Sequence, residues 1–160
     1  KYLKLFTFLD QRTIRELENA VETQPEQRQA QRKLAQEMTR IVHGETELAG
    51  AIQASQALFG GEIRGLPPAA IEEIFAEVPS SNLPKGQLEV SIPIVDLLVH
   101  SGLASSKGDA RRSIAEGGIY LNNQRVQEAT QTVTMADTLS GQFLVLRKGR
   151  KNYHLIKITG

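Results

Sequence analysis

The chain has 160 residues, which suits one medium domain or two small ones, and the hydrophobic fraction of 40% is enough to bury a core. It has no cysteine, which excludes disulfide scaffolds and thiolate metal sites, and no run of eighteen apolar residues to predict a membrane-spanning helix. The net charge of +1 divides into −2 over residues 1–86 and +3 over residues 87–160. This asymmetry favours a polyanion that contacts a defined basic face in the second half.

The first residues, Lys1–Asp10, do not have the charged region, apolar region and cleavage site of a signal peptide in that order. They contain no initiator Met and are densely apolar. We therefore expect the sequence to be a piece of a longer chain.

Residues 1–78 predict helices, because apolar residues recur there at the three- and four-residue spacing of a buried helix face. The first helix is expected to begin at Asp10 or Thr13 and to reach about Thr23. A second begins at Pro25 and ends at Gly44. A third ends at Gly60-Gly61, and a fourth begins at Pro67-Pro68. We predict one all-α domain over these residues.

Pro79–Ser91 is rich in proline, serine, glycine and asparagine, and it predicts a linker that acts as a hinge. Residues 92–160 then predict a small α+β domain. A short helix is expected at Pro93–Ser101, and a second, capped by Ser106, ends at Gly117-Gly118. Strand-like runs follow, at residues 119–121, 125–126, 143–146 and 153–158.

The sequence offers little for catalysis. The three histidines are more than 50 residues apart and have no metal-ligand spacing around them. Glu72 and Glu73 are adjacent on a predicted helix, where neighbours point in different directions, so a solvated face is the better interpretation. There is no glycine-rich phosphate loop after a strand and no nucleophile elbow. We expect no complete active site within these residues.

Basic residues are a stronger signal. Lys107, Arg111 and Arg112 lie on the outer side of the helix after Ser106, with Ala110 and Ile114 facing inward, and the helix N-terminus offers free N–H groups. Residues 147–160 contain five basic residues and no acid. If the sheet packs on the helix, the basic turn Arg147–Lys151 approaches the same side. The guanidinium group of arginine is suited to bidentate hydrogen bonds with phosphate. Taken alone, an arginine pair on a helix indicates an ordinary solvated face.

The second half resembles the S-four-type RNA-binding domain, in which two helices and a small sheet grip structured RNA. The likeness covers about 35 residues in order. It is carried by Ile94–Leu98, Gly102–Lys107, Ala110–Arg112, Ile114, Gly117–Asn123 and Arg125-Val126. The chain departs from the family at Ile92-Pro93, where many members carry an arginine, and at Asn122-Asn123, where Asn-Gly is commoner.

Residues 1–78 indicate a more specific family. They look like the helical anticodon-binding domain of bacterial-type tyrosyl-tRNA synthetases, which an S-four-type domain follows in that family. The segments that carry this likeness are Tyr2–Leu9, Ala30-Gln31, Leu34-Ala35, Thr39–Glu45 and Ala57–Phe59. Gly141–Phe143 and Arg147–Tyr153 are similar to the C-terminal end of the same enzymes.

The resemblance implies an α+β molecule: a helical anticodon-binding domain over residues 1–78, a linker over 79–91, and an S-four-like domain over 92–160 with two helices on a small, mostly antiparallel sheet. It implies binding of tyrosine tRNA at its anticodon stem and variable arm. Tyr120 and Tyr153 are candidates for base stacking. The predicted RNA-binding residues are Ser106, Lys107, Arg111, Arg112, Asn122, Asn123, Arg125, Arg147, Lys148, Arg150 and Lys151.

The same resemblance implies a parent enzyme, an ATP-dependent class I tyrosine–tRNA ligase, whose absent catalytic domain binds ATP and tyrosine. This piece would itself bind no cofactor or metal and would be a monomer, whereas the parent is a homodimer in the cytoplasm. Two alternatives remain. One is a mitochondrial-matrix synthetase that also binds intron RNA, and the other is a protein-interaction module.

Overall fold

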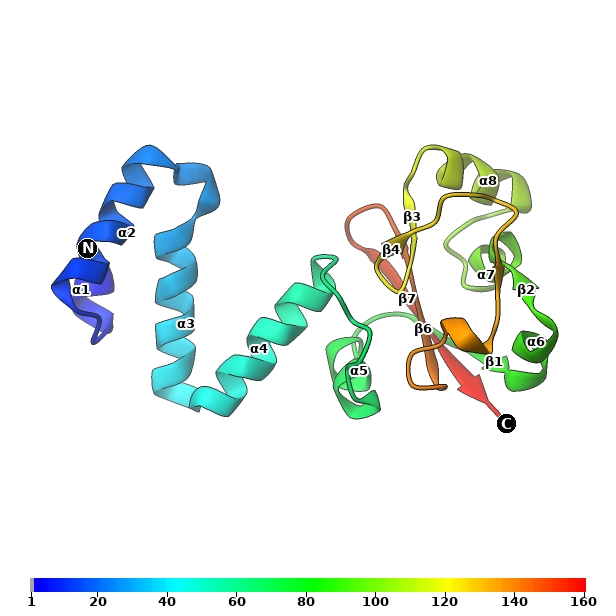
Figure 1. Cartoon of the computed structure of the whole chain (residues 1–160), viewed down its shortest axis with the longest axis horizontal. Coiled ribbons are helices and arrows are strands. Elements are labelled where there is room, and N and C mark those ends of the chain that lie inside the picture. The colour runs from blue at the N-terminus through cyan, green and yellow to red at the C-terminus, as the bar shows by residue number, and fades with distance from the viewer. Residues whose placement is uncertain (1) are drawn as a thin grey trace. The chain divides into compact units, whose positions relative to one another are not determined.

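The computed structural model describes residues 2–160, so Lys1, the first residue of the predicted helical domain, lies outside the described residues (Figure 1). The chain divides into two compact units between Gln53 and Ala54, within a helix. The predicted division at residues 79–91 is therefore wrong. No helix of residues 2–160 is both long enough and apolar enough to cross a membrane.

The first unit is helical, as predicted. It contains α1 (Tyr2–Phe6), α2 (Gln11–Thr23), a 3₁₀ turn η1 (Pro25–Gln27), α3 (Gln29–His43) and the first part of α4 (Glu45–Leu58). Asp10 caps α2, because its carboxylate accepts a hydrogen bond from the Thr13 N–H at 2.9 Å. Pro25 starts only the 3₁₀ turn, and α3 begins four residues later, after Arg28 has adopted a left-handed conformation.

The second unit is built on a five-stranded sheet in the order β1-β7-β6-β3-β4. These strands are β1 (Ser80–Pro84), β3 (Ile119–Leu121), β4 (Gln124–Arg125), β6 (Phe143–Lys148) and β7 (Asn152–Thr159). Only β1 runs parallel to its neighbour, β7, and the other pairs are antiparallel. A separate pair joins β2 (Ile92–Pro93) to β5 (Thr132–Val133).

Helices cover both faces of this sheet. These helices are α5 (Pro68–Ile74), α6 (Lys85–Val90), α7 (Ile94–His100), α8 (Lys107–Ala115) and the 3₁₀ turn η2 (Met135–Asp137). Successive side chains of a strand point to opposite faces, so Leu144 and Leu146 join a core with α7 and α8, whereas Phe143 and Val145 join a core with the end of α4 and α5. The predicted α+β fold with a small, mostly antiparallel sheet is confirmed, and the two predicted helices are α7 and α8, to which the structure adds α5 and α6.

The segment predicted as a linker is an integral part of the second unit. Residues 80–84 form β1, and residues 85–90 form α6. Leu83 and Leu88 are each only 1% exposed, so this segment contributes to the core that a hinge would lack. Pro84 is tolerated because β1 is an edge strand and Pro84 is its last residue, where a missing N–H removes no essential bond.

Candidate nucleic-acid interface

Helix α8 presents the predicted cations to solvent. The Ser106 hydroxyl caps it by accepting from the Asp109 N–H at 3.2 Å, as the sequence predicted. Ala110 and Ile114 are buried against the sheet, which leaves Arg111 and Arg112 exposed. The predicted inward and outward sides of this helix are confirmed.

The turn between β6 and β7, at residues 149–151, lies near the start of α8. Lys148 Nζ is 3.3 Å from Asp109 Oδ2, and this ion pair joins the end of β6 to the first turn of the helix. The hydrogen bond from the Ser105 N–H, then Lys148 and the charge of Arg112, lower the pKa of the Asp109 carboxyl. The helix and the basic turn therefore lie on one side of the unit, as expected if the sheet packs on α8.

Acidic partners neutralise part of the predicted basic surface. Lys107 Nζ is 2.7 Å from Asp96 Oδ1, and Lys157 Nζ is 3.4 Å from Glu72 Oε1. With Lys148 held by Asp109, the acids that residues 147–160 lack are supplied in part by other elements. Within residues 2–160, the predicted cations that are exposed and form no ion pair are Arg111, Arg112, Arg125, Arg150 and Lys151.

Arg147 is stacked rather than free. It lies opposite Tyr120 on β3 and opposite Tyr153 on β7, so the three side chains share one face of the sheet. Its Cζ is 3.6 Å from the Tyr120 ring centroid and 5.6 Å from that of Tyr153. Its Nη1 also donates to the Gly149 carbonyl at 2.7 Å. These contacts hold the turn in place, and the predicted contact of Arg147 with RNA stays a prediction.

Tyr153 is unavailable for stacking on a base. It is 7% exposed, and its hydroxyl donates to the Leu58 carbonyl at 3.1 Å. Burial raises the pKa of this phenol. Tyr120 remains partly exposed, beside Arg147.

The asparagine pair forms the turn between β3 and β4. Both residues have positive φ, 50° and 63°, as a two-residue hairpin turn requires. Asn122 is 1% exposed, and its amide donates to the Asp137 carbonyl while it accepts from the Val145 N–H. The Asn123 amide donates to the carbonyls of Ala57 and Gly61. The prediction of RNA contact is wrong for Asn122, and the Asn123 donors are also occupied, because both side chains fasten the hairpin to the core.

Arg125 lies opposite Tyr120, and its guanidinium crosses Gly117. A Cβ at Gly117 would overlap the guanidinium of Arg125, and Gly117 has a φ of 72°. Glycine is thus favoured there for its backbone conformation, because the exposed Arg125 side chain can move aside. The Arg125 side chain is exposed and can reach a ligand on this edge of the sheet.

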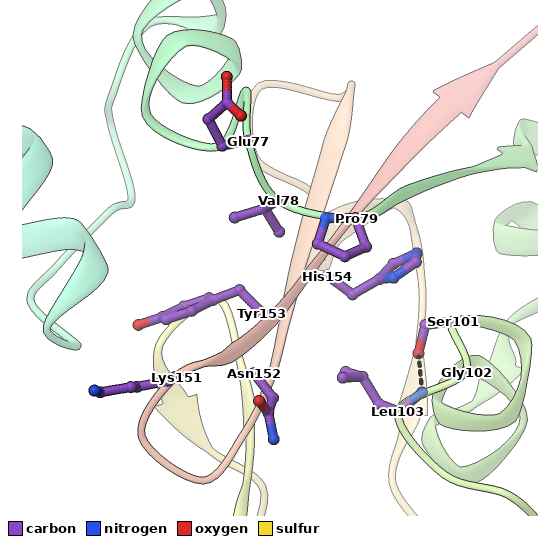
Figure 2. A pocket seen from close by; sticks show the side chains of 10 residues that line it. All are labelled: Glu77, Val78, Pro79, Ser101, Gly102, Leu103, Lys151, Asn152, Tyr153 and His154. Carbon is purple, nitrogen blue, oxygen red and sulfur yellow. Dashed lines mark hydrogen bonds between the residues drawn. The ribbon is translucent and has the colours of Figure 1, made fainter.

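A pocket of about 380 Å³ opens beside the basic turn (Figure 2). Its walls are residues 77–79 after α5, residues 101–103 after α7, and residues 151–154 at the start of β7. Figure 2 shows Tyr153 and His154 pointing in opposite directions, as neighbours on a strand must. His154 is 7% exposed, and its Nε2 lies 2.9 Å from the Ser81 hydroxyl.

Comparison with known proteins identifies the family. Residues 70–156 match the family model of the tyrosine–tRNA ligase SYY-like C-terminal domain. The chain belongs to this family. Residues 1–60 match a second model, that of the class I tRNA synthetases for tryptophan and tyrosine. A solved structure, the solution structure of a tyrosyl-tRNA synthetase C-terminal domain, covers 64% of this chain with 41% identity and a TM-score of 0.50, and is itself covered completely.

Two curated relatives are named tyrosine–tRNA ligase. That of Roseiflexus castenholzii is 49% identical over 99% of this chain, and that of Geobacillus stearothermophilus is 44% identical over 98%. The chain spans only 38% and 36% of their respective lengths. The predicted relation to the C-terminal region of tyrosyl-tRNA synthetases is therefore confirmed.

Proposed function

We propose that this chain is the tRNA-binding part of a tyrosine–tRNA ligase, which holds the anticodon stem and variable arm of tyrosine tRNA during aminoacylation. The family match over residues 70–156 is the observation that carries this proposal. The charge distribution supports it. Among residues 2–160, five of the predicted cations are exposed and form no ion pair, namely Arg111, Arg112, Arg125, Arg150 and Lys151. Phosphate contacts of this kind fix the position of an RNA, and polar or stacking groups read its bases.

We place the chemistry in the rest of the longer protein, an ATP-dependent class I ligase that binds ATP and tyrosine outside these residues. The piece itself would be a monomer without a cofactor, and the parent a homodimer. The named relatives are bacterial, which favours the cytoplasm and does not favour the mitochondrial, intron-binding alternative.

A salt series separates RNA binding from the protein-interaction alternative. Each neutralised phosphate contributes about −0.7 to −0.9 to the slope of log affinity against log salt concentration. With about three to five phosphates contacted, we expect a slope of roughly −2 to −4 for a tyrosine tRNA transcript. A slope near zero, as apolar docking gives, would contradict the proposal.

Replacement of Arg111 and Arg112 by alanine is expected to reduce this slope by about one to two and to weaken binding by about 1–3 kcal/mol. The matched control is Arg12→Ala with Arg15→Ala, on the exposed face of α2 in the first unit, where a smaller loss is expected. If the control pair lost more affinity for tRNA while both variants stayed folded, the assignment of the interface to α8 would be contradicted.

Arg147→Met gives a second contrast. Because Arg147 is stacked on Tyr120 and bonded to the turn, its loss should weaken tRNA binding while the salt slope stays unchanged. A fall in the slope equal to that of an exposed arginine would show that Arg147 contacts phosphate directly.

A further inference from the structure

The pocket beside the basic turn lies between two parts of the proposed interface (Figure 2). One wall is residues 101–103, which lead into Ser106 and the exposed arginines of α8. Another wall begins at Lys151, the last residue of the basic turn. The pocket therefore borders the segments that lead to both groups of cations.

The lining suits a flat, partly polar group. Val78, Pro79 and Leu103 provide apolar surface. The Asn152 side chain forms no hydrogen bond within the described part of the chain, and an amide offers both donors and an acceptor. Ser101 contributes less, because its hydroxyl already donates to the Leu98 carbonyl.

The volume of the pocket and the charges at its edge limit the kind of ligand that it can bind. Pockets for small ligands run from about 300 to 1,000 Å³, so a volume of about 380 Å³ admits one nucleoside rather than a longer segment. In Figure 2 the Glu77 carboxylate and the Lys151 ammonium lie at the edge of the group of lining side chains, with opposite charges. A multiply charged anion is therefore a poor fit, and an uncharged ring between apolar walls is a good one.

We propose that this pocket receives a single unpaired nucleobase of the bound tRNA, with apolar walls against its faces and the Asn152 amide at its edge. This inference rests on the proposed function and deepens it, because it names a place where the protein reads a base rather than phosphate. Sequence-specific RNA recognition characteristically uses bases that are splayed out of a helix in this way.

The test is chemical probing of a tyrosine tRNA transcript in complex with the full 160-residue chain. Base-specific reagents report the Watson–Crick edges of unpaired bases, and hydroxyl radicals report the backbone. We expect one unpaired base to be protected in the wild-type complex and to regain its free reactivity with Asn152→Trp, which fills the pocket. The backbone footprint should persist at saturating protein, with affinity about 5- to 160-fold lower, the range for loss of one stacked base.

Gln142→Trp is the matched control, because Gln142 is an exposed amide beside the opposite end of the β6–β7 pair and should leave the protection intact. If Asn152→Trp unfolds the unit, Asn152→Ala replaces it, and the protected base should then become partly reactive. A backbone footprint without any base that responds to Asn152 overturns this inference alone. Absence of the backbone footprint from the wild-type complex overturns the proposed function as well.

Discussion

The two units differ in what holds them together. Among the described residues, the first unit buries only two apolar side chains, Leu3 and Ile14, whereas the second buries 26. The first unit also leaves large apolar side chains exposed, among them Tyr2, Phe8 and Val42 at 64%, 88% and 64%. At about 25 cal/mol per Å² of buried apolar surface, the internal contacts of the second unit must contribute far more to folding.

Polar contacts do not make up this difference. The most buried charged residue of the first unit, Glu37, contacts Lys33 and Arg40 on the same helix, and the hydrogen bond from Arg40 followed by that from Lys33 lowers the pKa of its carboxyl. Pairs within one helix add only about 0.3–0.5 kcal/mol. Regular helices are thus no evidence that a unit has a hydrophobic core large enough to fold alone.

The largest expected effect comes from separating the units. A protein of residues 54–160 should unfold in one cooperative transition, because both cores of its sheet are complete within it. A peptide of residues 1–53 should show weak helicity and no cooperative transition, since isolated helices of this length are marginal in water. Circular dichroism during heating distinguishes the two. A sharp transition of the 1–53 peptide would overturn the comparison.

Single substitutions should repeat this contrast on a smaller scale. Leu97 is completely buried between α7 and the sheet, and Leu97→Ala should reduce the free energy of unfolding by about 2–5 kcal/mol. Val42 is exposed on α3, and Val42→Ala should change the free energy of unfolding by less than about 0.5 kcal/mol. Urea denaturation of the whole chain measures both. Comparable losses would mean that α3 is buried in solution.

The buried turn amide should have an intermediate effect. Asn122→Ala removes two hydrogen bonds and leaves the Val145 N–H without its partner, so we expect a loss of about 1–3 kcal/mol in the free energy of unfolding. Gln124→Ala, at the exposed end of the same turn, serves as the control and should cost little. If Asn122→Ala weakened tRNA binding without lowering stability, the residue would act at the interface after all.

The smallest expected effect depends on pH. Burial, then the charge of His100, lowers the pKa of His154 from 6.5. The unfolded chain therefore binds a proton near pH 6.5 that the folded chain does not, and stability should fall as the pH drops from about 7.5 through 6.5, by at most about 1.4 kcal/mol per pH unit. His154→Gln should flatten this dependence in urea denaturation at several pH values. An unchanged slope would assign the effect to another group.

Local signals in the sequence located most elements of the fold. The cap at Asp10, the glycine stop at Gly44 and the cap at Ser106 all lie at helix ends. Residues 79–91 have the composition of a linker, whereas the long-range pairing of β1 with β7 makes them part of the sheet. Composition describes local preference and contains no information about a partner strand some 75 residues away.

The candidate site shows the same limit. The exposure of Arg111 and Arg112 followed from helix periodicity, because Ala110 and Ile114 had to face inward. The ion pairs of Lys107 and Lys148 could not be predicted from helix periodicity, because their partners, Asp96 and Asp109, come from other elements. The stacking of Arg147 depends on strand register, which places Tyr120 and Tyr153 on either side of it. Only an assumed pairing of these strands would have indicated it.

The parallel pairing of β1 with β7 has a consequence for synthesis on the ribosome. Ser80 pairs with Leu155 and Pro84 with Thr159, so the sheet edge closes a loop of some 75 residues. Contacts so distant along the chain form slowly, because the entropy of closing the loop is lost before any contact repays it. The nascent second unit therefore stays open, with Leu83 and Leu88 without their final neighbours, until β7 has left the exit tunnel. A chaperone that recognises exposed leucines has that whole interval in which to bind.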